Sequence, residues 1–128
     1  MDDVYDLYRR GVELLEGGHH HQATVPLTRA RDLAPDKSSI REALGRALFG
    51  AQRYEQAAAE FRAVTERAPT NDFALFCLGR CLQLLGRDGE ARRPLAIAAC
   101  LQPDRRDYRV YRDRARERAA RSSRTPSS

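Results

Sequence analysis

Residues 44–48 have the sequence LGRAL, and residues 78–82, which lie 34 positions later, have LGRCL. In the same register, residues 10–14 have RGVEL and keep the glycine and the final leucine. A period of 34 residues that occurs three times indicates an array of similar units. Each unit in such an array buries its apolar face against its neighbours. The repeat therefore decides the fold that the sequence predicts.

Four other columns keep this spacing in all three units. They are Ala23, Ala57 and Ala91; Leu27, Phe61 and Leu95; Ala30, Val64 and Ala98; and Pro35, Pro69 and Pro103. Small residues in the glycine and alanine columns allow two antiparallel helices to approach closely, and the large apolar residues fill the space between them. Each proline ends a helix because it cannot continue the hydrogen-bond pattern. The pattern predicts two helices per unit, at residues 3–16, 20–33, 38–50, 54–67, 72–84 and 88–100.

A seventh helix is predicted at residues 104–120, where the repeat does not continue. Its apolar stripe, with Tyr108, Tyr111, Ala115 and Ala119 at helical spacing, predicts one face that packs on the third unit. Its other face is solvated, as the open end of a repeat array requires. Residues 121–128 are small and polar, and we expect a disordered tail there.

The period, the glycine and alanine columns and the closing proline resemble the tetratricopeptide repeat family, whose signature includes W-x2-L-G-x2-Y, A-x3-F and a final proline. The resemblance covers residues 4–105 and implies an all-α solenoid. This solenoid is a right-handed superhelix of three helix hairpins (about 4–37, 38–71 and 72–105) plus the C-terminal solvating helix, in one domain at residues 1–120. Arg41 departs from the pattern, because leucine stands at the matching positions 7 and 75. Ile40 beside it can compensate.

The resemblance also implies a concave groove lined by the first helix of each hairpin. Its predicted surface mixes aromatic rings with guanidinium groups, which are enriched in binding hot spots. Arg46 and Arg80 are 34 residues apart and are expected to stand side by side. The predicted groove residues are Tyr5, Tyr8, Arg9, Val12, Arg46, Phe49, Phe73, Phe76, Cys77 and Arg80.

The predicted function is that of a protein–protein interaction adaptor or chaperone-like scaffold that binds an apolar or acidic-apolar segment in this groove. Members of the family that grip the C-terminal tails of heat-shock chaperones use a clamp of Lys, Asn and Arg side chains. The positions that match this clamp hold Tyr8, Val12, Ala43, Phe73 and Cys77. None of these side chains binds a carboxylate as the clamp does, so such tails are not the expected partner.

The formal net charge of +5 suggests a second hypothesis. Residues 104–128 hold nine arginines and four acidic residues, so this segment carries the whole excess. Nucleic-acid or acidic-surface binding through the Arg-rich helix and tail is therefore the alternative function. Acidic residues interrupt the arginines, however, and a solvated face is the usual meaning of such a run. Self-association through the apolar groove is a third hypothesis.

No catalytic constellation or glycine-rich phosphate loop is present, and we predict neither an enzyme nor a cofactor. The consecutive residues His19, His20 and His21 point in different directions on a forming helix and are predicted to be turn and packing residues. The three cysteines Cys77, Cys81 and Cys100 form neither a disulfide scaffold nor a metal site with enough ligands. Reduced thiols, an N-terminus without a secretory pattern and no apolar run of about 18 residues predict a cytoplasmic protein with no membrane partner.

Overall fold

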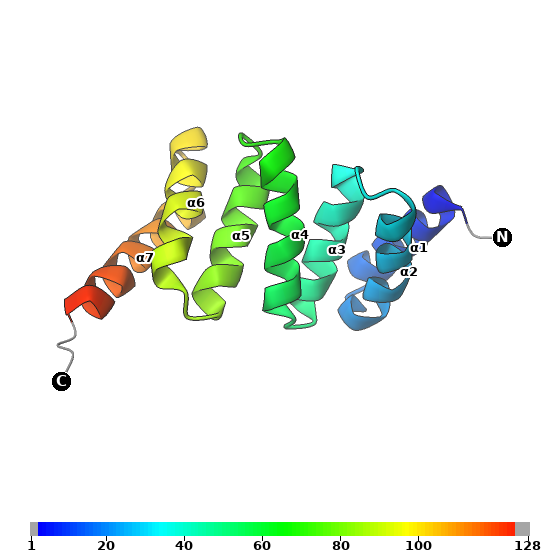
Figure 1. The fold of residues 1–128 in the computed structure, drawn as a ribbon, viewed down its shortest axis with the longest axis horizontal. Coiled ribbons are helices and arrows are strands. Elements are labelled where there is room, and N and C mark those ends of the chain that lie inside the picture. The colour runs from blue at the N-terminus through cyan, green and yellow to red at the C-terminus, as the bar shows by residue number, and fades with distance from the viewer. Residues whose placement is uncertain (1–2, 125–128) are drawn as a thin grey trace.

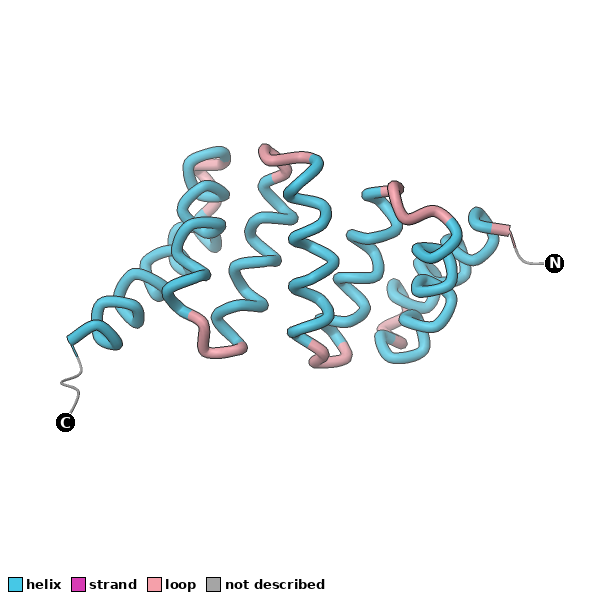
Figure 2. The backbone as a smooth tube through the Cα atoms, viewed as in Figure 1, coloured by secondary structure: helices cyan, strands magenta, loops and turns pink. Residues whose placement is uncertain are grey.

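The computed structural model describes residues 3–124, and this range contains seven helices and no strand. The helices stand in a row from the N-terminus to the C-terminus, and short loops join them at alternating ends (Figures 1 and 2). The fold is an all-α solenoid, as the sequence predicted. The helices are α1 (Val4–Glu16), α2 (His20–Leu33), α3 (Ser38–Gly50), α4 (Tyr54–Arg67), α5 (Asp72–Leu84), α6 (Asp88–Leu101) and α7 (Arg106–Arg124).

The first six helices begin and end within one residue of their predicted bounds, whereas α7 does not. It begins at Arg106 rather than at residue 104 and continues to Arg124 rather than ending at residue 120. The prediction of a disordered tail is therefore wrong for residues 121–124. Alanines at 119 and 120 favour helix, and Ser123 Oγ donates a hydrogen bond of 2.9 Å to the Ala120 carbonyl. Residues 125–128 of the predicted tail lie outside the described residues.

The repeated columns form the helix–helix contacts. Leu27, Phe61 and Leu95 are fully buried, and each packs against the glycine of its own hairpin. A Cβ atom on Gly45 would lie 2.8 Å from Phe61 Cζ, and a Cβ atom on Gly11 or Gly79 would overlap the facing leucine. The predicted close approach of the paired helices is therefore confirmed.

Each helix packs mainly against the helices before and after it in the chain, and α1 also contacts α3, as α5 contacts α7. One apolar cluster extends from Leu15 in the first hairpin to Ala115 in α7. Contacts between successive elements, joined by a continuous core, give the extended shape in Figure 1.

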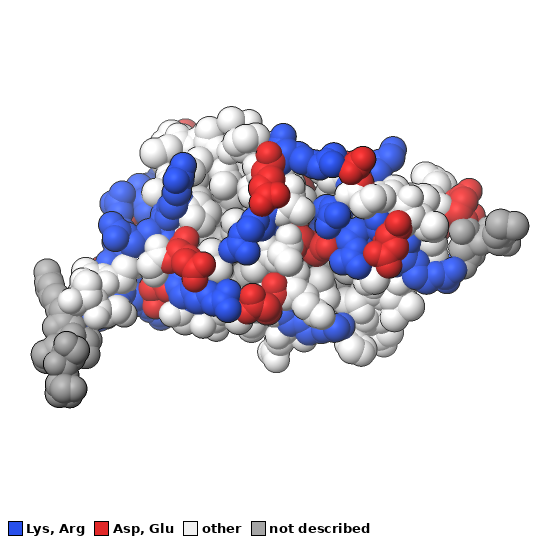
Figure 3. Space-filling view, in the orientation of Figure 1, with Lys and Arg blue, Asp and Glu red and all other residues white. Residues whose placement is uncertain are grey.

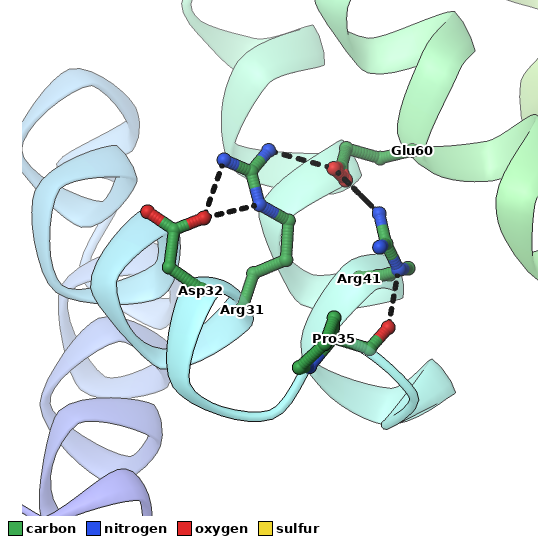
Figure 4. Close-up of polar contacts among 5 residues, drawn as sticks. All are labelled: Arg31, Asp32, Pro35, Arg41 and Glu60. Carbon is green, nitrogen blue, oxygen red and sulfur yellow. Dashed lines mark hydrogen bonds and ion pairs between the residues drawn. The ribbon is translucent and has the colours of Figure 1, made fainter.

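A buried ionic cluster joins the first two hairpins (Figure 4). Glu60 on α4 is only 4% exposed. Its Oε1 accepts hydrogen bonds from Arg31 Nη1 at 2.9 Å and from Arg41 Nη1 at 3.1 Å. The bond to Glu60 is the main cause that raises the pKa of Arg31. Arg41 thus has an ionic role where the other hairpins have leucine, and Ile40 takes the buried place in the core, as predicted.

Candidate binding groove

A hollow of about 640 Å³ opens between α3, α5 and α7. The C-terminal part of α3 forms one wall, α5 forms the opposite wall, and α7 closes one side. We call this hollow the aromatic groove. Its lining residues are His20, Arg46, Phe49, Gly50, Phe61, Phe73, Phe76, Cys77, Arg80, Asp107 and Tyr111.

The phenylalanines of α5 differ in how far their rings are already covered. Phe73 is 37% exposed. Phe76 is half-buried, stacks on Tyr108 with ring centroids 4.6 Å apart, and meets Tyr111 edge-on at 5.6 Å. Helix α7 therefore already uses much of the Phe76 surface. Phe73 is the α5 ring that remains open to a partner.

The arginines of the groove differ in the same way. Arg80 Cζ lies 3.9 Å from the centroid of the Tyr111 ring, and Arg80 Nη1 donates a hydrogen bond of 2.9 Å to Gln83 Oε1. Gln83 Nε2 in turn donates to the Tyr111 carbonyl at 3.0 Å, so Arg80 is fixed against α7. Arg46 is exposed and has no hydrogen bond, ion pair or ring contact among residues 3–124. Arg46 and Arg80 therefore both line the groove, but Arg80 is held against α7 whereas Arg46 is open to a partner.

The one carboxylate that lines the groove among the described residues, that of Asp107, already has an ionic partner. Asp107 Oδ2 accepts from Arg105 Nη2 at 2.7 Å, and this contact is the main cause that lowers the pKa of Asp107. The side chain of Arg46 is consequently the one cation of the lining that lacks a partner within residues 3–124.

The thiol of Cys77, which lines the groove, is unreactive at neutral pH. Burial, followed by the neighbouring Cys81, raises the pKa of Cys77 to about 12. A protonated thiol is neither a nucleophile nor a metal ligand at neutral pH. Within residues 3–124, no three His, Cys, Asp or Glu side chains are grouped so that they could hold a metal ion.

His20 occupies the end of the groove. Its ring packs against Gly50, where a Cβ atom would overlap it. It is therefore a packing residue, as predicted. Its Nδ1 atom is buried and has no hydrogen-bond partner among the described residues.

The structure brings together six of the ten predicted groove residues and separates the other four. Arg46, Phe49, Phe73, Phe76, Cys77 and Arg80 line the aromatic groove. Tyr5 and Tyr8 line a separate hollow of about 310 Å³ near Ile40. Arg9 lies in a shallow polar hollow of α1, and Val12 packs on the core. The four residues of the first hairpin therefore lie outside the aromatic groove, and their part in binding stays a prediction.

Besides His20, Gly50 and Phe61 of the hairpins, two lining residues that were not predicted belong to α7, namely Asp107 and Tyr111. They lie outside the repeat and had no column with which to align. The stripe of Tyr108 and Tyr111 at helical spacing was the available signal, but it indicated only that α7 packs inward. Tyr108 is in fact fully buried, and its hydroxyl donates a hydrogen bond of 2.8 Å to Asp72 Oδ2. This ring therefore cannot stack on a nucleic-acid base, and nucleic-acid binding stays a prediction.

The tetratricopeptide repeat family model matches residues 8–72 and again residues 42–107. The chain belongs to the tetratricopeptide repeat family. Together the two matches span most of the chain, including all of α2 to α6. None of the helices within residues 3–124 is long and apolar enough to cross a membrane.

Several solved tetratricopeptide structures are similar to this chain. A structure of MamA is 28% identical with a TM-score of 0.85, covering 93% of this chain and 65% of MamA. YrrB, described as having an unusual peptide-binding site, is 24% identical with a TM-score of 0.78, covering 91% of this chain and 58% of YrrB. The first TPR of Spaghetti (RPAP3), bound to the HSP90 peptide SRMEEVD, is 15% identical with a TM-score of 0.83, covering 91% of this chain and 93% of that domain.

Among curated proteins, the mouse (Mus musculus) superkiller complex protein 3 is 32% identical over 83 residues. This match covers 65% of the chain but only 5% of that protein. The chain is therefore similar to a small part of a much longer protein.

Proposed function

We propose that this tetratricopeptide protein is an interaction scaffold, and that its aromatic groove binds an apolar segment of another protein. An acidic residue of that segment pairs with Arg46. The observation that carries the proposal is the coexistence, in one hollow of about 640 Å³, of a partly exposed phenylalanine and an arginine without a partner among the described residues. Apolar hollows with a few polar groups that fix orientation are typical of binding sites.

The size of the groove fits a modest affinity. A fully covered aromatic ring buries about 150–250 Å², but Phe73 has only 37% of its surface left to bury. At about 25 cal/mol/Å², such a ring and its neighbours contribute a few kcal/mol, and part of this gain is offset by the ordering of the segment. A dissociation constant on the order of micromolar is the expected result.

Two of the similar structures support a protein or peptide as the class of partner. YrrB is described by its peptide-binding site, and the RPAP3 domain holds an HSP90 peptide. Their low identity shows the fold alone, so the chemistry of the partner is argued from the groove itself. Because Phe73 and Cys77 occupy positions that a carboxylate clamp would need, the proposed partner is an apolar segment rather than a chaperone tail.

The test compares two double variants in affinity capture from an extract of the source cell. Arg46→Gln/Phe73→Ala changes two exposed residues of the aromatic groove. Tyr5→Ala/Arg9→Gln changes an exposed tyrosine and an exposed arginine outside it and is the matched control. We expect a protein that the wild type and the control retain, and that the groove variant loses at least tenfold. Equal retention by the groove variant and the wild type would contradict the proposal.

A further inference from the structure

A second hollow, of about 370 Å³, lies between α6 and α7 and shares no residue with the aromatic groove. It is lined by Gly89, Arg92, Arg93 and Ala96 of α6 and by Arg116 of α7. We call it the arginine cleft. The four α6 residues have the spacing i, i+3, i+4 and i+7, so they share one face of the helix. A Cβ atom on Gly89 would meet nothing within 4 Å, which shows that the floor of the cleft is open.

Within residues 3–124, the arginine cleft lies where the single helix α7, rather than a further hairpin, packs on α6. Thr24 and Ala58 occupy the same repeat column as Arg92, and they are only 5% and 1% exposed. Arg92 is exposed. Helix α7 slopes away from α6 toward its C-terminal end (Figure 1). The repeat position that the first two hairpins bury at Thr24 and Ala58 is therefore open at Arg92, beside Arg116.

The charges that face the cleft are almost entirely positive. Arg92 and Arg93 have no hydrogen bond, ion pair or ring contact within residues 3–124. Arg116 Nη1 lies 4.0 Å from Asp113 Oδ1, an atom that already accepts from Arg112 Nε at 3.0 Å. In Figure 3 basic side chains lie at this end of the molecule, as they do along the rest of the visible face.

The two acids in the first turn of α6 do not line the cleft. Glu90 Oε2 lies 3.9 Å from Arg87 Nε, and Asp88 has a buried carboxylate oxygen. No side chain caps the N-terminus of α6, and the partial positive charge of this helix end adds to the potential over Gly89.

We propose that the arginine cleft binds a phosphoryl group, either free phosphate or a phosphorylated side chain of a protein. Guanidinium groups stay charged at physiological pH and donate paired hydrogen bonds to phosphate oxygens. Three of them reach one hollow from two helices, and a dianion relieves their mutual repulsion. No aromatic ring lines the cleft, so a nucleic-acid base finds no surface on which to stack. A phosphorylated protein side chain or the free anion therefore fits better than a nucleic acid.

The first test is a titration of the full, ¹⁵N-labelled chain with sodium phosphate, with sodium chloride at equal ionic strength as the reference. We expect saturable shifts of the Gly89 amide and of the side-chain N–H signals of Arg92, Arg93 and Arg116. Because a hydrogen bond to a charged group contributes about 1.5–3 kcal/mol, Arg92→Gln/Arg93→Gln should weaken the apparent affinity at least tenfold. Arg53→Gln/Arg62→Gln removes two other exposed arginines, lowers the net charge equally and should leave the affinity within about twofold.

The same variants distinguish the proposal from a general effect of charge. Equal weakening in both double variants, or shifts that rise linearly without saturation, would overturn it. Thermal unfolding of both variants checks that each retains the fold. A peptide with one phosphoserine identifies the source of the group: tighter binding than phosphate assigns it to a protein, and equal binding assigns it to the free anion. Tighter binding of a short oligothymidylate than of this peptide would overturn the proposal in favour of nucleic acid.

Discussion

Glu60 is the one charged side chain among residues 3–124 that is buried. It has two guanidinium partners, and both Arg31 and Arg41 keep part of their side chains in solvent, with 29% and 23% exposed. Their charges therefore remain partly hydrated, and the cost of burying the cluster falls mainly on the carboxylate. The cluster fixes the first hairpin to the second through directional bonds in addition to apolar contacts.

The prediction at this scale concerns the charge of Glu60. Glu60→Gln keeps the shape but weakens two charge-assisted hydrogen bonds, and it should lower the free energy of unfolding by about 2 kcal/mol. Glu55→Gln is the control, because Glu55 is 63% exposed in its pair with Arg87 and such surface pairs contribute about 0–1 kcal/mol. Urea unfolding of the three proteins measures the difference. Equal stability of the two variants would show that the buried cluster contributes no more than a surface pair.

Sequence reasoning identified Arg41 as a departure from the repeat but did not find its partner. Arg31 lies 29 residues from Glu60, and Arg41 lies 19 residues from it. In a chain with 32% charged residues, many pairs of opposite charge have comparable spacing. Only the packing of α2, α3 and α4 selects this one.

At the scale of the element, α7 is the part that the sequence described least well. The other six helices follow from the 34-residue period, because each position in one hairpin has a matching position in each of the other two hairpins. Helix α7 lies outside the repeat and has no matching positions in the hairpins. Neither its length nor its contribution of Asp107 and Tyr111 to the groove could therefore be predicted from the repeat. The groove residues predicted in the first hairpin lie elsewhere for a different reason. Tyr5 and Tyr8 keep their repeat positions on α1, but they line a separate hollow beside Ile40.

The prediction at this scale concerns the attachment of α7. The pKa of Tyr108 is raised above its usual range, first by burial and then by the hydrogen bond to Asp72. An unfolded tyrosine titrates near pH 10, so the stability that the neutral hydroxyl contributes is present below about pH 10 and is lost as the pH rises above it. Tyr108→Phe should cost about 1 kcal/mol at pH 7 and should lose less stability than the wild type between about pH 10 and 11.

Urea unfolding at a series of pH values checks both parts of this prediction. Tyr5→Phe is the control, because Tyr5 is 68% exposed. This substitution should leave the dependence of the unfolding free energy on pH unchanged. The buried thiols of Cys77 and Cys81, each with a pKa raised to about 12, titrate alike in all three proteins and cancel in the comparison. If Tyr108→Phe and the wild type declined in parallel at alkaline pH, the hydroxyl would not be the group responsible.

At the scale of the whole molecule, stability is distributed along a line. The helices contact mainly their neighbours in the chain, so the middle hairpin is supported on two sides and each end on one. Repeat arrays of this kind open from their ends. Hydrogen exchange should therefore be slowest in α3 and α4 and faster in α1 and in the second half of α7. Uniform protection across all seven helices would contradict this and would indicate a single cooperative unit.

The exposed position of Arg92 has a consequence for how such an array can be lengthened. The matching side chains Thr24 and Ala58 are small, so a following hairpin can stack on them at no electrostatic cost. A hairpin stacked on α6 would have to strip water from an arginine that has no counter-charge, which costs several kcal/mol. The charge at position 92 thus disfavours the addition of a further hairpin to α6. An engineer who wished to splice a fourth unit onto α6 would first have to restore a small residue there.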